Sequence, residues 1–295
     1  MQAISIGEVL WDVIGEAEHL GGAPFNFAAH LQNLGHKVHL LSAVGADKRG
    51  QEVLSRMKQM GLCTRHVSQV AAYPTGTASV VLDRTGQPRF LINHPAAYDF
   101  PLISEHEANQ LCSLPPDLIY FGTLCQMSSQ ARQVTLTLLE HCSARHHFYD
   151  VNLRADSYEP DLVRELMSRA TVVKVNDEEV RAIAEMFATP IHSLEHFCRS
   201  YAETFRWEAV CVTRGAQGCV LLMKEIFVVH AGYAVTVADT IGAGDAFAAA
   251  FAHGLVSGWG ASQTADFANR VGALVASHAG ATPDWTLEEA ARLRH

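Results

Sequence analysis

An acid that follows closely spaced glycines is the sharpest chemical feature of the chain. Residues 239–247 read DTIGAGDAF, so Gly242, Ala243 and Gly244 stand directly before Asp245 and an alanine-rich helical segment. Small residues at a helix N-terminus let backbone N–H groups approach an anion, and the helix dipole favours negative charge there. A carboxylate repels phosphate, so it is better suited as a base that takes a proton from an attacking hydroxyl. The stretch therefore indicates phosphoryl transfer, with simple N-terminal capping by Asp245 as the alternative.

Two common nucleotide-binding motifs fail at specific residues. The run from Gly45 to Gly50 has the glycine spacing of a P-loop, but Gln51 follows where the motif needs lysine. Gly242 also begins a G-x-G-x-x-G pattern, which has Phe247 in place of the last glycine and falls late in the chain. A nicotinamide oxidoreductase is therefore a weak alternative.

A second glycine pair lies near the start of the chain. Gly21 and Gly22 precede a helical stretch from Asn26 that stops at Gly35. Backbone amides can again approach a ligand here, and Asn26 offers donors and acceptors to a hydroxyl-rich molecule. Asp12, expected at the end of the first strand, could accept from two adjacent sugar hydroxyls. The plain alternatives are an N-cap at Asn26 and a solvated loop acid at Asp12.

These residues must be positioned by alternating β-rich and helical segments, the pattern of a parallel sheet covered by helices. The clearest predicted strands are 37–43, 117–121, 147–151, 171–175 and 209–213, and the clearest helices are 26–33, 50–60 and 177–187, with a capping box opening a last helix at 286. Segments 13–22 and 75–98 look like exposed β structure, with a hairpin turn at 83–86. We expect one α/β domain over residues 1–295, in which the small β region is either a lid or an edge hairpin.

Composition and charge exclude several classes of partner. Asp and Glu total 31 against 22 Lys and Arg, and the formal charge of −9 argues against nucleic-acid polymers and anionic membranes. The longest nearly apolar segment, 246–256, is too short to span a bilayer. Seven cysteines without a C-x-x-C pair predict no disulfide framework, no zinc finger and a cytoplasmic location. His192 and His196 lack a third ligand for zinc.

Taken together, the two glycine-rich stretches resemble both signatures of the PfkB, or ribokinase-like, carbohydrate kinases. Asn26-x-Ala28, Gly35 and Gly45 match the first signature and residues 239–245 match the second, in the family's order and across nearly the whole chain. The resemblance implies a three-layer α/β sandwich with a mostly parallel sheet, a β-sheet lid, an Asp245 base and an anion hole at 242–244. It also implies ATP as the phosphoryl donor, Mg²⁺, and a monovalent cation such as K⁺.

Further site residues follow from the resemblance. The nucleotide would contact Asn176, Thr213, Gly215, Gly218 and Asn269. The sugar would contact Asp12, Gly21, Gly22, Asn26, Gly122, Asn152 and Arg154. Glu179 ends a match to the family's N-x-x-E and would hold hydrated magnesium, which prefers to keep several waters. Asp239, with the Ile241 carbonyl, would hold the monovalent cation.

The substrate expected from the resemblance is a neutral ketose, with fructose first. Residues 7–12 and 150–154 look most like fructokinases and the related 2-keto-3-deoxygluconate kinases. An acid sugar would favour an arginine fork for its carboxylate, and segment 90–97 has no arginine where those kinases commonly carry one. Alternatives are a 2-keto-3-deoxygluconate kinase, a kinase for ribose, tagatose or a nucleoside, and a catalytically silent sugar-binding regulator. Lid-mediated dimers in the family suggest a homodimer.

Overall fold

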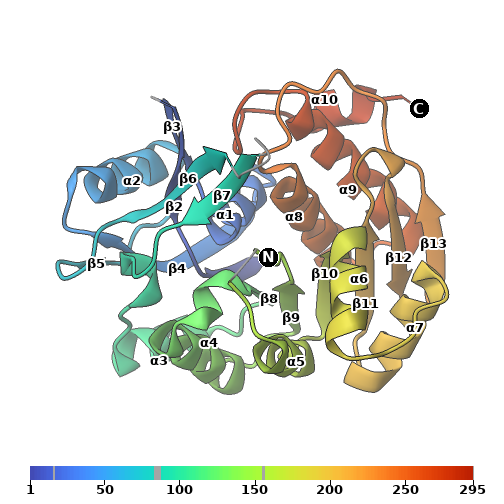
Figure 1. The fold of residues 1–295 in the computed structure, drawn as a ribbon, viewed down its shortest axis with the longest axis horizontal. Coiled ribbons are helices and arrows are strands. Elements are labelled where there is room, and N and C mark those ends of the chain that lie inside the picture. Colours follow the sequence, from blue (N-terminus) through green and yellow to red (C-terminus); the bar gives the residue numbers. More distant parts are fainter. Residues whose placement is uncertain (16, 83–87, 155–156, 295) are drawn as a thin grey trace.

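The computed structural model describes residues 1–15, 17–82, 88–154 and 157–294. They form three layers, in which a large sheet lies between two layers of helices (Figure 1). In this part of the chain the sheet has nine strands, in the order β13-β12-β11-β10-β9-β8-β1-β4-β5. Neighbours from β11 to β5 are parallel, whereas β12 pairs antiparallel with both β11 and β13. The strands are β1 (Gln2–Ile6), β4 (Lys37–Gly45), β5 (Val67–Val70), β8 (Leu118–Gly122), β9 (His146–Asp150), β10 (Val172–Asn176), β11 (Ala209–Thr213), β12 (Cys219–Met223) and β13 (Ile226–His230).

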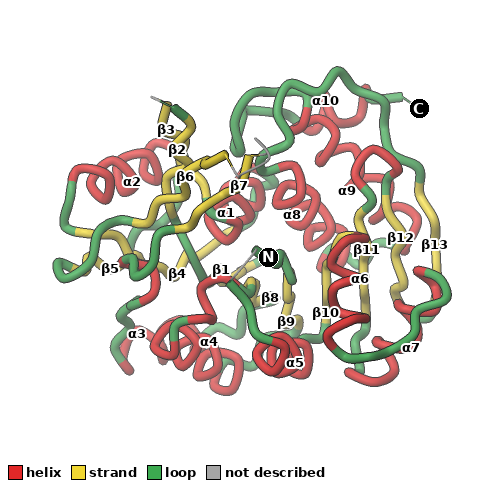
Figure 2. Tube along the Cα trace, in the orientation of Figure 1, coloured by secondary structure: helices red, strands yellow, loops and turns green. Residues whose placement is uncertain are grey.

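Helices cover both faces of this sheet, so its central strands are apolar on both sides (Figure 2). In β1, Ala3 packs into the core on one face, while Ile4 and Ile6 pack into the core on the other. The first face is covered by α1 (Ala23–Asn33), α2 (Lys48–Gln59), α8 (Ala243–Val256), α9 (Ala261–Ala276) and α10 (Leu287–Arg292). The second face is covered by α3 (Glu105–Ser113), α4 (Ser129–His141), α5 (Pro160–Arg169), α6 (Asp177–Met186) and α7 (Leu194–Phe205). No helix in the described ranges is long and apolar enough to cross a membrane.

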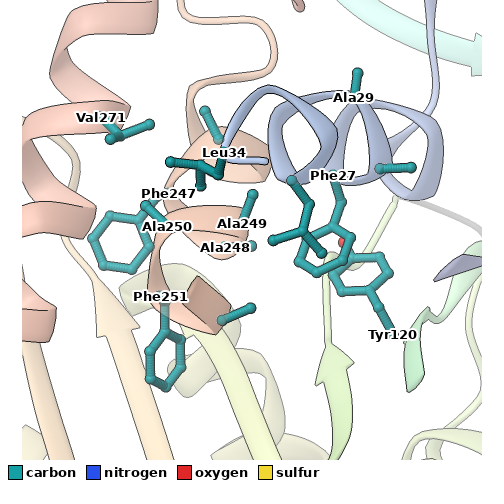
Figure 3. Close-up of a cluster of buried hydrophobic side chains, with 14 of the residues drawn as sticks. Phe27, Ala29, Leu34, Tyr120, Phe247, Ala248, Ala249, Ala250, Phe251 and Val271 are labelled. Atoms are coloured by element: carbon teal, nitrogen blue, oxygen red, sulfur yellow. The ribbon is translucent and has the colours of Figure 1, made fainter. Parts of the chain in front are cut away.

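Small side chains let α8 lie close to α1 and α9 (Figure 3). Ala248, Ala249 and Ala250 are buried at the centre of this cluster. A Cβ added at Gly254 would lie 2.8 Å from Thr264 Oγ1 of α9, so the two helices approach at a distance that only glycine allows here. This packing places the N-terminal turn of α8 at the edge of the large sheet where the strands end.

A second, small sheet stands beside the large one. Among the described residues it has four strands in the order β3-β2-β6-β7. They are β2 (Leu10–Ile14), β3 (Ala17–Gly21), β6 (Gly76–Leu82) and β7 (Pro88–Ile92). Leu10 and Ala78 of this sheet pack against Tyr98 in a separate apolar cluster. The predicted β segments are thus present, and the turn predicted at 83–86 lies outside the described residues.

The strands and helices named as clearest in the sequence begin and end within three residues of the observed ones. The bounds predicted for β11 are those observed. Thr286 caps α10 through the predicted capping box with Glu289. The cysteine prediction was wrong in one respect, because a disulfide joins Cys112 at the end of α3 to Cys142 after α4. The two residues are 30 positions apart without a C-x-x-C motif, so only the packing of α3 on α4 brings them together.

Candidate active site

A cavity of about 340 Å³ opens where the parallel strands end. The chain runs outward from β1 through β4 and β5 on one side and through β8 to β11 on the other, and open α/β sheets bind ligands at such a switch point. The lining includes many of the residues predicted from the sequence: Asp12, Gly22, Asn26, Asn152, Arg154, Asn176, Glu179, Thr213, Gly242, Gly244 and Asp245. These residues are far apart in sequence, and the fold brings them to one place.

The glycine-rich turn is built against the C-terminal part of the chain. Gly242 precedes α8 with a φ of 78°, and a Cβ there would lie 2.3 Å from Ala281 O. The Ala243 N–H donates to Thr240 O at 3.3 Å. Because the first N–H groups of a helix have no partner within it, the N–H groups of Gly244 and Asp245 remain available to an anion. Gly242 and Gly244 line the cavity, whereas Ala243 does not, and the anion hole at 242–244 stays a prediction.

Asp245 extends from the first turn of α8 toward α1. Asn26 Nδ2 donates to Asp245 Oδ2 at 2.8 Å. Burial, and next the negative charge of Asp150, raise the pKa of Asp245 to about 6, against the lowering effects of Asn26, Lys174 and Arg154. A carboxyl group with this pKa is ionised at neutral pH and yet basic enough to accept a proton.

A buried charge network below this turn was not predicted from the sequence. Lys174 Nζ lies 2.8 Å and 3.1 Å from the two oxygens of Asp150, and Tyr120 donates to the same carboxylate at 3.0 Å. Lys174 lines the cavity, and a Cβ at Gly244 would lie 3.8 Å from its Nζ. The available signal was a single lysine inside the apolar strand segment 172–175, because an unpaired lysine is rarely buried.

Glu8 is a second lining residue to which the sequence assigned no role. It follows β1 and is only 4% exposed. Burial raises its pKa to about 7. The acid expected at the end of the first strand is therefore Glu8, whereas Asp12 lies in β2 of the small sheet.

Most of the residues assigned to the sugar line the cavity, namely Asp12, Gly22, Asn26, Asn152 and Arg154. A Cβ at Gly21 would lie 2.7 Å from Asp12 Oδ2, so this glycine leaves room for the acid without lining the cavity itself. Asn152 has a φ of 41°, a left-handed conformation that asparagine tolerates, and turns the chain toward Arg154. Gly122 ends β8 opposite Asp150 and does not line the cavity.

The residues assigned to the nucleotide divide into two groups. Asn176 caps α6 and Glu179 completes the capping box, with the Glu179 oxygens accepting from the N–H groups of Leu153 and Asn176 at 2.8 Å each. These two residues and Thr213 line the cavity. The members that lie outside the lining are Gly215 and Gly218, in the turn between β11 and β12, and Asn269 on α9.

Asn269 and Asp239, which do not line the cavity, have clear hydrogen-bond partners. Asn269 donates to Ala265 O at 2.7 Å and to Cys219 Sγ at 3.1 Å. Asp239 accepts the N–H of Ile241 at 3.0 Å and that of Gly280 at 3.2 Å. Asp239 thereby ties the loop before α8 to the loop after α9.

Solved structures share this architecture. A fructokinase with bound ATP from Xylella fastidiosa has a TM-score of 0.85 at 22% identity, over 95% of this chain and 94% of that one. An uncharacterized sugar kinase from Pyrococcus horikoshii in complex with ATP has a TM-score of 0.81 at 26% identity, over 96% and 94%. A fructokinase of Escherichia coli is 27% identical in sequence over 300 residues, 94% of this chain and 93% of the relative.

The fold is the ribokinase-like α/β fold, with a small β-sheet lid beside the large sheet. The chain matches the pfkB family carbohydrate kinases over residues 7–287 and belongs to that family. The family and the fold predicted from the two glycine-rich signatures are thereby confirmed.

Proposed function

We propose that this protein transfers the γ-phosphoryl group of ATP to a hydroxyl of a neutral ketose, with fructose as the first candidate. The observation that carries the proposal is Asp245, held by Asn26 at 2.8 Å in the cavity and in the first turn of α8. The fructokinase of E. coli and the ATP complex of the P. horikoshii sugar kinase support the choice of substrates.

The geometry suits Asp245 as the base. Asn26 engages Oδ2, which leaves Oδ1 for the sugar hydroxyl. As Asp245 takes the proton, the sugar oxygen bonds to the γ-phosphorus, and the bond from that phosphorus to the bridging oxygen breaks with its electron pair leaving on ADP. The N–H groups of Gly244 and Asp245 would stabilise charge on the transferred phosphoryl group. The small sheet would exclude water, which competes with the sugar as acceptor.

The donor set on the other side of the cavity fits hydrated magnesium. Each Glu179 oxygen accepts one backbone N–H and keeps a lone pair, and the side chain lines the cavity. Magnesium, when bound, would neutralise charge on the phosphates, and Glu179 and Asn176 would hold it through water. A monovalent cation at Asp239 stays a prediction, and we assign it no step.

The charges around the cavity favour a neutral sugar over an acid sugar. Lys174 is paired with Asp150. Arg154 forms no ion pair within the described residues, but its charge already lowers the pKa values of Glu8, Asp12 and Asp245. A sugar carboxylate would add a further negative charge to this group, whereas hydroxyls would not.

The test is an ADP-coupled assay with fructose, tagatose, 2-keto-3-deoxygluconate, ribose and adenosine. We expect the highest kcat/KM for a neutral ketose, and a kcat lower by at least about a hundredfold for Asp245→Asn. The matched control is Asp161→Asn, which removes an exposed acid from the first turn of α5 and should behave as wild type. Turnover of the acid sugar alone would refute the substrate class, and absence of turnover with every acceptor would refute the proposed activity.

A further inference from the structure

Two buried acceptor atoms on the sugar side of the cavity lack hydrogen-bond partners. Glu8 is 4% exposed and Asn26 is 3% exposed, and both line the cavity. Among the described residues, nothing donates to Glu8 Oε2 or to Asn26 Oδ1. Buried polar atoms are nearly always satisfied in native proteins, so an orphan on a residue that lines a cavity points to a ligand that supplies the missing donor.

The backbone around Glu8 is closely packed, so the chain position from which its side chain extends is fixed. A Cβ at Gly7 would lie 2.5 Å from Pro24 Cγ, and one at Gly22 would lie 2.6 Å from Glu8 O. Gly22 O in turn accepts the N–H of Asn26 at 2.8 Å. Glu8 and Asn26 are therefore linked through Gly22 and occupy neighbouring parts of the same wall.

The orphaned acceptors lie beside the group that performs the chemistry. The Asn26 amide binds Asp245 through Nδ2, so its Oδ1 is only a few bonds from the catalytic carboxylate. The charge of Asp245 also contributes to the raised pKa of Glu8. A hydroxyl that donates to Asn26 Oδ1 is consequently close, along the sugar, to the hydroxyl that Asp245 deprotonates, and we expect the donor to Glu8 to belong to the same part of the sugar.

We propose that Glu8 determines substrate specificity, in that its unpartnered oxygen accepts a hydrogen bond from a sugar hydroxyl near the one that is phosphorylated. This inference rests on the proposed sugar kinase activity. It implies that the cavity selects a fully hydroxylated ketose over the analogue that lacks this hydroxyl, because the deoxy sugar would leave the buried carboxylate without a donor. Sites built to bind a hydroxyl reject its deoxy analogue far more strongly than apolar pockets reject a missing methylene.

The test combines Glu8 variants with deoxy sugars. For whichever ketose the wild type phosphorylates, kcat/KM is measured with the parent sugar and with each monodeoxy analogue that keeps the phosphorylated hydroxyl, for wild type, Glu8→Leu and Glu8→Gln. We expect Glu8→Leu to lower kcat/KM for the parent sugar by about a hundredfold or more, and to change it less than about threefold for one particular deoxy sugar. Glu8→Gln keeps an acceptor oxygen and should lose less than Glu8→Leu.

Gln126 offers a matched control. It is 0% exposed, both atoms of its amide lack partners among the described residues, and it does not line the cavity. Gln126→Leu should therefore leave the preference among sugars unchanged. The melting temperature of Gln126→Leu should stay equal or rise, because the substitution removes an unsatisfied buried polar group.

The outcomes separate the two proposals. If the wild type phosphorylates no sugar, the proposed function fails, and this inference fails with it. If the wild type phosphorylates a ketose but Glu8→Leu lowers kcat/KM equally for the parent and every deoxy sugar, Glu8 has a structural role and the specificity proposal is wrong. Should Glu8→Leu not fold, a wild type that phosphorylates every monodeoxy sugar that keeps the acceptor hydroxyl as well as it phosphorylates the parent would overturn the proposal.

Discussion

The Lys174→Met variant should be markedly less stable than the wild type, because it leaves a buried carboxylate without its counter-charge. The Lys174 and Asp150 side chains are 8% and 0% exposed, and Nζ lies 2.8 Å from the nearer oxygen. Removing one partner of a buried ion pair costs about 3–5 kcal/mol. With an unfolding entropy of about 2.1 cal/mol/K per residue, a 295-residue chain should lose roughly 5–8 °C in Tm.

The Asp150→Asn/Lys174→Met double variant should recover most of this loss. Replacing a buried ion pair by neutral groups of similar size is often neutral in stability. Tyr120, which donates to Asp150, keeps an acceptor in the asparagine oxygen. Calorimetry of the wild type, both single variants and the double variant gives the coupling energy directly. A Lys174→Met protein within about 1 kcal/mol of wild type would refute the buried pair as a determinant of stability.

The double variant also tests how the pair acts on the base. Asp150 raises the pKa of Asp245 more than Lys174 lowers it, so removal of both charges should bring this pKa below its value of about 6. The acidic limb of the kcat/KM profile, measured between pH 4.5 and 8, should then move to lower pH. A limb that stays in place or moves upward would show that these charges do not tune the titrating base.

Three further changes test the site and the fold. Asp245→Asn should lower kcat by at least about 10²–10⁴ while calorimetric sugar binding survives, and near wild-type ATP consumption with sugar would contradict its role as base. In the wild type, the pKa of about 6 means that kcat/KM falls as pH drops through 6 and the base gains its proton, so a flat profile from pH 5 to 8 would count against it. Gly242→Ala introduces a Cβ 2.3 Å from Ala281 O at positive φ, so turnover and Tm should both fall, and a fully active, equally stable variant would be inconsistent with this turn. Cys112→Ser opens the bond to Cys142, and the 30-residue separation predicts a loss of about 3–4 kcal/mol, measured against wild type in urea without reductant; equal midpoints would mean that the crosslink adds nothing.

The parts of the site that could be predicted are those formed by residues that lie close together in the sequence. Gly242, Gly244 and Asp245 stand within a few residues of each other, and glycine before a helix has a specific physical meaning. The parallel sheet followed from alternating β-rich and helical segments, whose periodicities differ. The lid segments followed from exposed β patterns at 13–22 and 75–98, and strands β2, β3, β6 and β7 lie within or close to them.

The parts that could not be predicted depend on contacts between distant elements. Lys174 and Asp150 become partners only because β9 and β10 are neighbours, a register that no short window of sequence specifies. Glu8 matters because its second oxygen has no donor, a property of three-dimensional packing and not of residue type. Cys112 and Cys142 meet only when α3 packs on α4.

The hydrogen bond between Asn26 and Asp245 joins residues 219 positions apart, which has a consequence for synthesis of the protein. A ribosome makes α1 early, but α8, which packs against it, appears only after most of the chain has been translated. Until then the apolar side of α1, including Phe27 and Leu31, lacks this neighbour, and such exposed surface makes nascent intermediates prone to aggregate. The base and the amide that orients it therefore come together only late, so the growing chain is without catalytic power for most of its elongation.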